Sequence, residues 1–303
     1  LNPLRWRVDL ALVSVALVWG TTFVLVKQAL ADISTLLFLT LRFAVAALAL
    51  GLLLNKRLRS DLAEPLLRSR SIRAGVLAGV FLAGGYLFQT FGLKYTTPAK
   101  AGFLTGLYIP LVPLFGAMVY KKAPNASELV GVVCAFAGMA LMTVERNLGG
   151  VGGGDVLVMI CAVAYAFHIL VLGRFAADSS VAIMSVVQIA TAALLGAATC
   201  WWAEPVHVVW TSPVVLALGI TSLFATALAF SIQTWAQQYS SPTRTALIFS
   251  LEPVFAWATS YVVADEVLSG RAMLGAALIM AGILTVELKP FQRRIPAGQV
   301  ASS

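Results

Sequence analysis

Long apolar runs separated by short polar stretches make up most of this chain of 303 residues. A transmembrane helix needs about 20 consecutive, mostly apolar residues, and ten runs come close to this length. They lie at residues 8–28, 35–55, 72–93, 97–119, 127–145, 154–173, 181–203, 212–236, 242–263 and 271–288. The pattern therefore predicts an all-α integral membrane protein with ten transmembrane helices.

Two stretches of the chain, 88–110 and 232–254, resemble each other at an offset of 144 residues. The matched pairs are Gln89 and Gln233, Thr90 and Thr234, Phe91 and Trp235, Tyr95 and Tyr239, Pro98 and Pro242, Lys100 and Arg244, Gly131 and Gly275, and Gly138 and Gly282. Matches at one fixed offset indicate an internal duplication. We therefore predict two five-helix repeats, at 8–145 and 154–288, followed by a tail at 289–303.

An odd number of helices in each repeat turns the second repeat over in the membrane. Such inverted repeats suit alternating access around a site at their interface. The glycine-rich stretch at 149–154 joins the two predicted halves. It fits either a hinge or an ordinary loop, and the sequence leaves both open.

Lys and Arg collect on one side of the predicted membrane. With the N-terminus inside, 15 of the 21 basic residues fall inside, 5 fall outside and Arg42 lies within a helix. Because basic loops stay on the cytoplasmic side, we expect a multi-pass protein of the inner (plasma) membrane with both termini in the cytoplasm. The first apolar segment is too long for a cleaved signal peptide, so we expect it to be retained.

The composition excludes an ordinary soluble domain, since 60% of the residues are hydrophobic and only 11% are charged. The net charge of +8 would suit a nucleic-acid partner if the basic residues formed a patch. The densest basic stretch, 56–73, lies instead between two apolar segments. We interpret it as an anchor that contacts anionic lipid headgroups, and we expect membrane lipid and no nucleic acid among the partners.

The loops are too short to hold a soluble catalytic domain. An intramembrane enzyme would need a Ser–His pair, two intramembrane aspartates or a metal motif such as HExxH. His168 is the only histidine in a predicted helix, and Cys134, Cys161 and Cys200 lie in apolar runs without a CxxC spacing. We therefore expect no catalytic residue, no metal and no cofactor. An intramembrane enzyme is the disfavoured non-transport alternative.

Glu252 is the one carboxylate near the middle of a predicted helix. A charge at the bilayer centre costs roughly 2.5–3.5 kcal/mol, so Glu252 should face the interior of the bundle. There it could bind an amine or couple transport to protons. It could equally form a helix–helix hydrogen bond, because Pro253 leaves a backbone carbonyl without its usual partner. Pro110, Pro113 and Pro253 should each kink a helix.

Aromatic residues form a second group of candidates for a substrate site. The repeat partner of Glu252 is Tyr108, so the predicted interior holds one acid among aromatic rings. Such rings could stack on a flat ligand or hold an amine by cation–π contact, and packing is their alternative role. The candidates are Trp19, Tyr86, Tyr108, Tyr165, Trp235 and Phe249.

Polar side chains inside predicted helices form a third group. Gln89 and Gln233 are repeat partners, and amides at this depth need hydrogen-bond partners, either on a substrate or on another helix. His168 could relay protons and is, with Glu252, a candidate for coupling. A neutral, hydrogen-bonded histidine is the alternative. Arg42 could bind a substrate carboxylate or brace helix ends near the outer side.

Lys100 and Arg244 match in the repeat and could form a two-armed phosphate clamp. In an inverted repeat, however, they lie on opposite faces of the membrane. Each side chain would then reach its own headgroup layer, which argues against phosphorylated substrates.

Five groups of residues follow one another along the chain: Trp19-Gly20-Thr21-Thr22-Phe23, Leu41-Arg42-Phe43, the stretch 89–110, Ser250-Leu251-Glu252-Pro253-Val254, and Glu266 followed by Gly275 and Gly282. Together they resemble the EamA-type members of the drug/metabolite transporter superfamily, over roughly residues 10–288. One departure is that the first half has Tyr120-Lys121-Lys122 where an acid matching Glu266 would stand. This departure puts in doubt a transport role for Glu266.

The resemblance implies a carrier with ten helices in an inverted repeat that moves small metabolites, often outward. Relatives handle amino acids, amines and carboxylates, and more distant ones carry nucleotide sugars or sugar phosphates. We therefore expect a secondary active exporter of amino acids or related amines and carboxylates, with a proton or a counter-substrate as its coupling partner. The alternative is an exchanger of phosphorylated metabolites or nucleotide-sugar-like solutes.

Overall fold

The computed structural model describes residues 3–119, 126–143 and 152–288. Its regular structure is helical throughout these ranges, apart from one isolated β-bridge. The predicted tail at 289–303 lies outside the described residues, as do the first three residues of the glycine-rich stretch. Six of the basic residues counted above also lie outside: Lys121, Lys122, Arg146, Lys289, Arg293 and Arg294.

Eight helical segments of the described chain are long and apolar enough to cross a membrane. They are Leu4–Ala29, Thr35–Leu53, Pro65–Tyr95, Pro98–Val119, Gly153–Asp178, Val181–Thr199, Ser212–Ala236 and Pro242–Ala264. Two further apolar helices, Leu129–Gly138 and Gly270–Gly282, are shorter. Each of these segments overlaps one of the predicted ones, which confirms the all-α membrane class. A full crossing by the two shorter helices stays a prediction.

The helices divide between the two halves of the chain. The first half holds α1 (Pro3–Ala29), α2 (Thr35–Leu53), α3 (Asn55–Leu62), α4 (Pro65–Tyr95), α5 (Pro98–Thr105), α6 (Tyr108–Val119) and α7 (Ala126–Thr143). The second holds α8 (Gly153–Phe175), η1 (Ala176–Asp178), α9 (Val181–Thr199), α10 (Ser212–Ser222), the π-helix η2 (Leu223–Leu228), α11 (Ala229–Ala236), α12 (Pro242–Ile248), α13 (Leu251–Ala264) and α14 (Gly270–Leu288).

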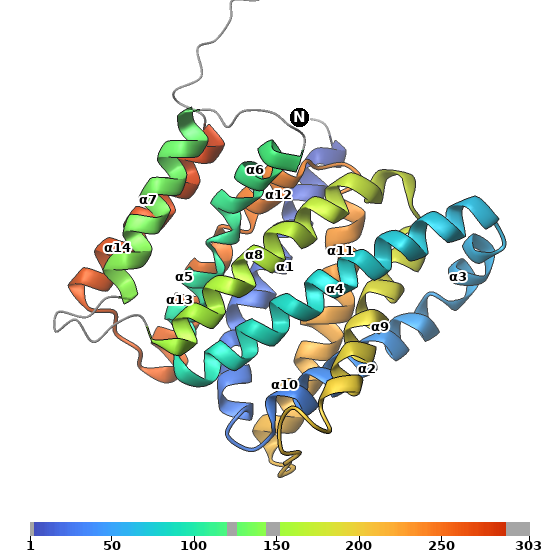
Figure 1. The fold of residues 1–303 in the computed structure, drawn as a ribbon, viewed down its shortest axis with the longest axis horizontal. Helices are drawn as coiled ribbons and strands as arrows, with labels where there is room; N and C mark the ends of the chain where they lie inside the picture. The colour runs from blue at the N-terminus through green and yellow to red at the C-terminus, as the bar shows by residue number, and fades with distance from the viewer. Residues whose placement is uncertain (1–2, 120–125, 144–151, 289–303) are drawn as a thin grey trace, which may run out of the picture.

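The two halves interlock in one bundle. Helices α7 and α14 pack against each other at one edge of the molecule, and α3 lies at the opposite edge (Figure 1). Between these edges, α1 packs on α13, α4 on α8 and α9, and α2 on α9. Each of these contacts joins an element of the first half to one of the second.

Glycine allows two of these helix pairs to approach closely. A Cβ atom at Gly20 of α1 would lie 2.7 Å from the Glu252 carbonyl oxygen and 2.9 Å from the Ala256 nitrogen, both on α13. Gly138 of α7 lies directly against the Gly275 carbonyl of α14. Small residues at such crossings let the backbones of membrane helices touch.

Two of the predicted helices are broken near their middle. One divides into α5 and α6 at Gly106–Leu107, and the other divides into α12 and α13 at Phe249–Ser250. Pro110 and Pro253 each lie four residues after the first residue of a break. Because proline has no N–H, it cannot form the helical bond to that position. The kinks expected at these two prolines are therefore present as breaks.

The starts of α5 and α12 have the same local structure. The Thr97 hydroxyl accepts a hydrogen bond from the Lys100 amide at 3.3 Å, and the Ser241 hydroxyl accepts one from the Arg244 amide at 3.2 Å. Each cap is followed by a proline at the first helical position, where the missing N–H costs nothing. Repeat-related segments thus fold alike at this point.

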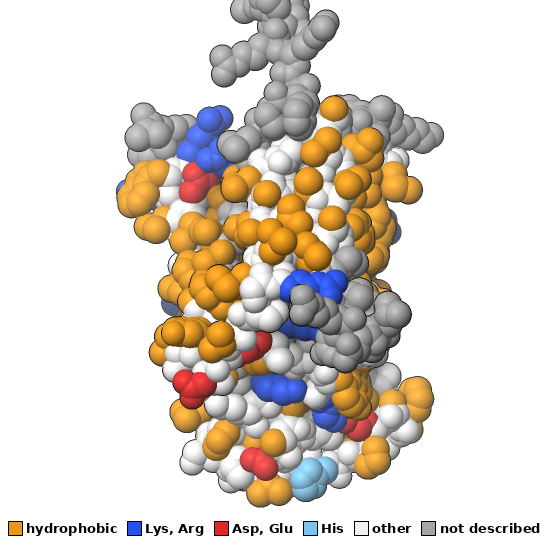
Figure 2. Space-filling view, turned by 90° about the vertical axis from the view of Figure 1, so that its left-hand side faces the viewer, with side chains coloured by type: hydrophobic (Ala, Val, Ile, Leu, Met, Phe, Trp, Pro, Cys, Tyr) orange, Lys and Arg blue, Asp and Glu red, His pale blue; other side chains and the backbone are white. Residues whose placement is uncertain are grey.

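The outer surface of the bundle is apolar over a broad area. Hydrophobic side chains cover much of the face that α7 and α14 form, and several charged side chains lie toward the lower end of this view (Figure 2). Val133, Met273 and Leu274 are more than half exposed there. An apolar surface of this kind suits contact with lipid chains.

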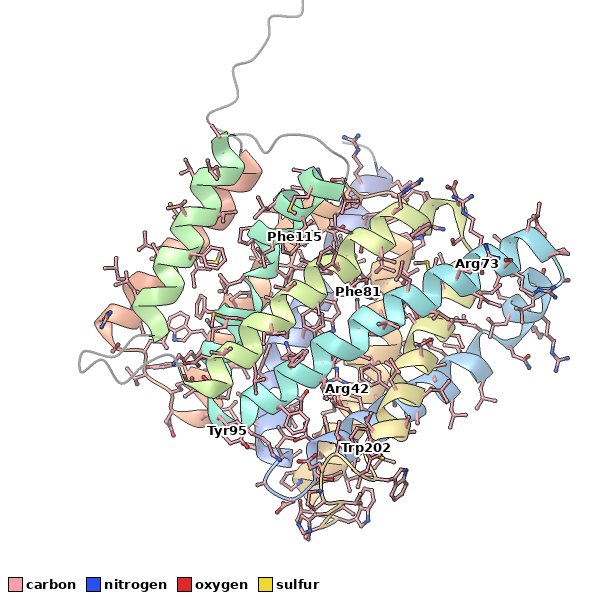
Figure 3. The ribbon with its side chains drawn as sticks, in the orientation of Figure 1. Arg42, Arg73, Phe81, Tyr95, Phe115 and Trp202 are labelled. Atoms are coloured by element: carbon pink, nitrogen blue, oxygen red, sulfur yellow. The ribbon has the colours of Figure 1, made fainter. Side chains whose placement is uncertain are left out.

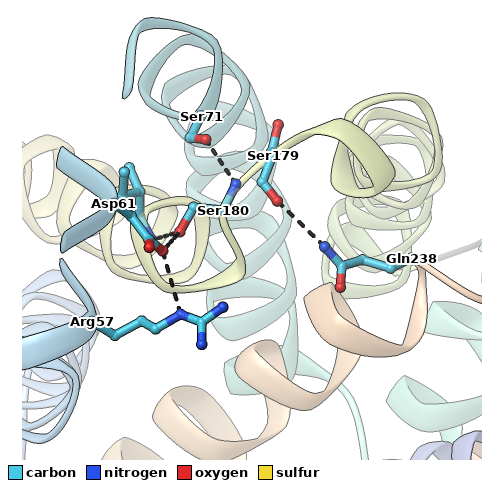
Figure 4. A network of polar contacts seen from close by, with 7 residues as sticks. Arg57, Asp61, Ser71, Ser179, Ser180 and Gln238 are labelled. Carbon is cyan, nitrogen blue, oxygen red and sulfur yellow. Dashed lines mark hydrogen bonds and ion pairs between the residues drawn. The ribbon is translucent and has the colours of Figure 1, made fainter. Parts of the chain in front are cut away.

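A polar network closes the end of the bundle that holds the start of α1, which we call the N-terminal end. There the Ser180 hydroxyl donates to Asp61 of α3, and the Ser180 amide donates to the Ser71 hydroxyl of α4. Gln238 donates to the carbonyl oxygen of Ser179 (Figure 4). The network therefore ties α3 and α4 of the first half to the second half.

Candidate functional site

A cavity lies inside the bundle at the level of the two helix breaks. Nine of the ten residues predicted for the substrate site line it: Trp19, Tyr86, Gln89, Tyr108, Tyr165, His168, Gln233, Phe249 and Glu252. They come from both halves of the chain, and transporters built from repeats place their sites between the repeats. The structure thus brings these residues together around one space.

Trp235 is the exception among the predicted residues and lies outside the cavity lining. Its ring is half-buried and packs against Tyr239, with a centroid distance of 5.8 Å. Gln233, two positions earlier, faces the cavity. Two residues correspond to about 200° around a helix, so Trp235 points to another side.

Tyr108 and Glu252 join the two breaks. The Tyr108 hydroxyl donates a hydrogen bond to Glu252 Oε2 at 3.0 Å, and both side chains are buried. Tyr108 begins α6, and Glu252 lies in the first turn of α13, at the positive end of that helix dipole. This bond therefore joins the first half of the chain to the second inside the bundle.

Arg42 of α2 is a further residue of the cavity wall. Its side chain lies inside the bundle, whereas Arg73 and Trp202 lie at the periphery (Figure 3). The guanidinium donates from Nε to Thr226 Oγ1 at 2.7 Å and from Nη2 to the Tyr86 hydroxyl at 3.0 Å. The sequence leaves two roles open for Arg42, and the structure places its side chain in the cavity wall.

A π-helical segment, η2, faces Arg42 and Trp19. The indole nitrogen of Trp19 donates to the Ala225 carbonyl at 2.8 Å, and Arg42 Nη2 lies 3.5 Å from the same oxygen. A π-helix changes the backbone hydrogen-bonding pattern and often occurs at functional sites. Here a backbone oxygen of η2 takes side-chain donors from the first half.

His168 belongs to a chain of hydrogen bonds. Its Nε2 lies 2.9 Å from Gln188 Oε1, and Gln188 Nε2 donates to Thr234 Oγ1 at 2.9 Å. Thr234 Oγ1 in turn donates to the Phe230 carbonyl. His168 therefore lines the cavity and is held by Gln188 of α9.

The two repeat-related glutamines differ in how they are satisfied. Gln89 donates to Thr105 Oγ1 at 3.1 Å and accepts from the Tyr165 hydroxyl at 3.2 Å. Gln233 donates to Gln237, but its Oε1 is buried and has no hydrogen-bond partner among the described residues. Gln233 therefore presents an unused acceptor at the cavity wall.

Aromatic rings form one wall of the cavity. The ring centroid of Trp19 lies 4.9 Å from that of Phe249 and 5.1 Å from that of Phe230. Tyr86 meets Tyr165 edge to face at 5.7 Å. These tilted and edge-to-face contacts fix the rings in place. The indole N–H of Trp19 and the hydroxyls of Tyr86 and Tyr165 bond to other groups of the site.

Seven other lining residues were not predicted from the sequence: Thr22, Phe23, Val26, Thr90, Leu93, Ile169 and Phe230. Most of them follow a predicted residue at helical spacing. Phe23 lies four positions after Trp19, and Leu93 lies four after Gln89. Residues three or four apart share a face of a helix, and this rule applied to the predicted residues would have found them.

The cavity is narrow in this conformation. Its volume is about 50 Å³, and a wider hollow of about 500 Å³ lies toward the end of the bundle opposite the start of α1. Val26 and Leu93 line the cavity, and their chain neighbours Lys27 and Lys94 line the hollow. The two spaces therefore follow each other along α1 and α4.

Lys27 lines this hollow. Its ammonium donates to the carbonyl oxygens of Leu93 at 2.7 Å, Lys94 at 2.8 Å and Thr96 at 3.1 Å. These carbonyls end α4, where backbone acceptors lack helical partners. Lys27 thus holds α1 against the end of α4.

Ion pairs at the same end join the two halves. Lys94 pairs with Glu204 at 2.8 Å, and Lys100 pairs with Asp155 at 2.7 Å. Glu266 accepts hydrogen bonds from the Ala99 amide at the start of α5 and from the Ser260 hydroxyl of α13. Within the described residues, no three His, Cys, Asp or Glu side chains gather closely enough to hold a metal ion.

A model of the EamA-like transporter family matches this chain twice, over residues 6–144 and 152–288. The chain belongs to the EamA-like transporter family. The resemblance found in the sequence is thereby confirmed. An uncharacterized transporter of Archaeoglobus fulgidus is 33% identical over 285 residues, which cover 94% of this chain and 87% of the relative.

More distant relatives and a solved structure cover nearly the same length. YedA, an uncharacterized inner membrane transporter of Escherichia coli K12, is 22% identical over 92% of this EamA-like chain and 90% of its own. A chain of known crystal structure matches with a TM-score of 0.69 at 21% identity, over 93% of this chain and 97% of the other. This last similarity shows a shared fold.

Proposed function

We propose that this EamA-like protein is a secondary transporter that exports an amino acid or a related amine or carboxylate by alternating access. The observation that carries the proposal is the buried cavity between the halves, where aromatic rings surround Glu252, Arg42 and two glutamines. Apolar walls with a few convergent polar groups are typical of small-molecule sites. The narrow space favours a small substrate.

An inverted repeat of five helices supports alternating access in this proposal. The two family matches divide the chain near the predicted boundary, and the repeat partners Tyr108 and Glu252 meet at the centre. Polar contacts tie the halves at both ends of the bundle, by Ser180 at the N-terminal end and by Lys94 and Lys100 at the other. Opening one end would require breaking only the contacts of that end.

Lys100 and Arg244 do not form the clamp that phosphorylated substrates would need. Lys100 pairs with Asp155, and Arg244 pairs with Asp9 at 2.7 Å near the start of α1. The two cations therefore lie at opposite ends of the bundle, each beside its own acid. Neither lines the cavity.

Transport by the purified protein in proteoliposomes tests the function. Amino acids, polyamines, organic acids and sugar phosphates are offered with and without a proton gradient, and counterflow is measured. Saturable counterflow of one class supports the carrier. Linear flux without saturation would indicate a channel, and no flux of any class would contradict the transport function.

Glu252 is the residue we propose for proton coupling, with His168 beside the same cavity. The change Glu252→Gln keeps the shape of the side chain and removes its titratable carboxyl group. We expect proton-driven accumulation to fall by roughly 5–150-fold, the usual size of a coupling between two ligands, while counterflow without a gradient persists and no longer depends on pH. The matched control is Glu64→Gln, because Glu64 is exposed outside the cavity. Unchanged accumulation at every pH would remove Glu252 from the coupling role.

The orientation in the plasma membrane is part of the proposal. We infer that both termini lie in the cytoplasm, because most basic residues fall on the N-terminal side. A single cysteine placed at Arg68 or at Pro205, in a cysteine-free background, tests this. Labelling of intact cells by a membrane-impermeant maleimide should reach the second position and spare the first.

A further inference from the structure

Arg42 is a buried cation surrounded by neutral partners. Its side chain is 3% exposed, and its donors meet a threonine hydroxyl, a tyrosine hydroxyl and a backbone carbonyl. Its guanidinium carbon also lies 4.4 Å from the Tyr86 ring centroid. Across the ranges that the structure describes, Arg42 forms no ion pair with an acidic side chain.

A buried charge without a counter-ion is costly. Isolated charges in an apolar interior are unfavourable unless they are paired, and arginines within membrane segments normally pair or face a water-filled path. Glu252 lines the same cavity, but its carboxylate takes the Tyr108 hydroxyl. The counter-ion that Arg42 lacks in the protein can therefore come from a bound solute.

Gln233 provides a second and independent indication of a ligand. Its side chain is 1% exposed, it lines the cavity, and its Oε1 has no donor within the described part of the chain. A buried acceptor without a partner is unfavourable by about 1–3 kcal/mol. An ammonium or amide N–H of a bound molecule would satisfy it.

Resting on the transport function above, we propose that Arg42 binds the carboxylate of the substrate and that Gln233 Oε1 accepts a hydrogen bond from its amino group. The substrate class is then a small molecule with one carboxylate and one amino group. Amines without an acidic group are poor substrates in this proposal.

The charge of the lining favours a carboxylate over a phosphate. Among the described residues that line the cavity, Arg42 is the single Lys or Arg. A carboxylate carries one negative charge and fits the planar fork of a guanidinium. A phosphate monoester carries nearly two charges at neutral pH, and one cation would leave it undercompensated.

Counterflow in proteoliposomes tests the assignment with matched probes. The twenty protein amino acids are screened first, and each active one is compared with its amide, its decarboxylated amine and its deaminated acid. Inorganic phosphate and a sugar phosphate are the phosphate probes. We expect the amide and the amine to compete at least roughly 30-fold more weakly than the parent amino acid, which is the loss expected when one partner of a buried charge pair is removed.

Variants separate binding from folding. Arg42→Gln should lower the apparent affinity for the amino acid by roughly 30-fold or more and leave that for the amine nearly unchanged. Arg42→Lys should restore part of the preference, since it keeps the charge. Gln233→Leu should lower the apparent affinity for the amino acid and leave that for the deaminated acid nearly unchanged. Arg73→Gln, an exposed arginine of α4, is the matched control, and monodispersity and thermal stability are measured for every variant.

The outcomes are distinguishable. If the wild-type protein exchanges amines or phosphates as well as amino acids, and Arg42→Gln leaves this pattern unchanged, the anion assignment is wrong and the transport function stands. If Arg42→Gln lowers the affinity for all probes equally, together with thermal stability, Arg42 is a structural brace. If the wild-type protein exchanges no probe, both proposals fall.

Discussion

At the residue scale, the hydrogen bond between Tyr108 and Glu252 can be removed by deleting a single oxygen atom. Tyr108→Phe deletes the hydroxyl and leaves a buried carboxyl group without this donor. We expect the free energy of unfolding to fall by about 1–3 kcal/mol, measured by thermal denaturation in detergent. Tyr261→Phe is the control, because Tyr261 is 55% exposed. Equal loss in both variants would show that the bond contributes little.

The repeat and the depth in the membrane each give a reason for a side chain to face the interior of the bundle. Glu252, Gln89 and Gln233 were chosen for these reasons and line the cavity. Trp235 is a candidate as an aromatic residue of a predicted helix, but its residue type does not state which way the side chain points, and it lies outside the cavity lining. Arg42 was left open because a permanent charge suits either a helix end or a site, and only its neighbours decide between them.

At the element scale, the crossing of α1 and α13 depends on Gly20. A methyl group there would meet the backbone of α13 at Glu252 and Ala256, and the backbone cannot move aside as a side chain could. We expect Gly20→Ala to destabilise the protein by about 1–3 kcal/mol, the usual cost of overpacking, and to slow transport. Thermal denaturation and counterflow are the measurements.

Gly219→Ala is the matched control for this crossing, because nothing lies within 4 Å of the position that its Cβ would take. In an open helix position, alanine is favoured over glycine by up to about 1 kcal/mol. The control should therefore be neutral or slightly stabilising. A similar loss in both variants would mean that α1 and α13 adjust freely to each other.

Among the elements, the two helix breaks are marked in the sequence by prolines, and η2 is not. Pro110 and Pro253 mark positions where a helical bond is missing, so interruption near them follows from their chemistry. The π-helix at Leu223–Leu228 contains no proline or glycine. It lies where Trp19 and Arg42 donate to the Ala225 carbonyl, and such contacts arise only after the first half has packed on it.

At the scale of the whole molecule, alternating access requires the halves to separate at one end at a time. Lys94 and Glu204 join the halves at the end away from the start of α1. We expect a flexible thiol crosslinker between cysteines at these two positions, in a cysteine-free background, to abolish counterflow. Cleavage of the crosslinker by a reductant should restore it.

The control for the crosslink is a cysteine pair at Asn55 and Arg59, which lie one turn apart within α3. A link inside one helix cannot restrain the halves, so transport should persist with this pair. Full counterflow in the crosslinked Lys94 and Glu204 variant would show that this end need not open during transport.

The sequence alone determined the class of the protein, the places of its apolar helices and most of the residues that gather in the cavity. These properties follow from local chemistry, since apolar length fits a bilayer and a buried polar group must face inward. The tertiary structure alone decided that Tyr108 contacts Glu252 and that Arg42 lines the cavity without forming an ion pair within the described residues. It also decided that Trp235 lies outside the cavity. These outcomes depend on how helices distant in sequence rotate and pack against one another, and periodicity along a single chain does not specify that rotation.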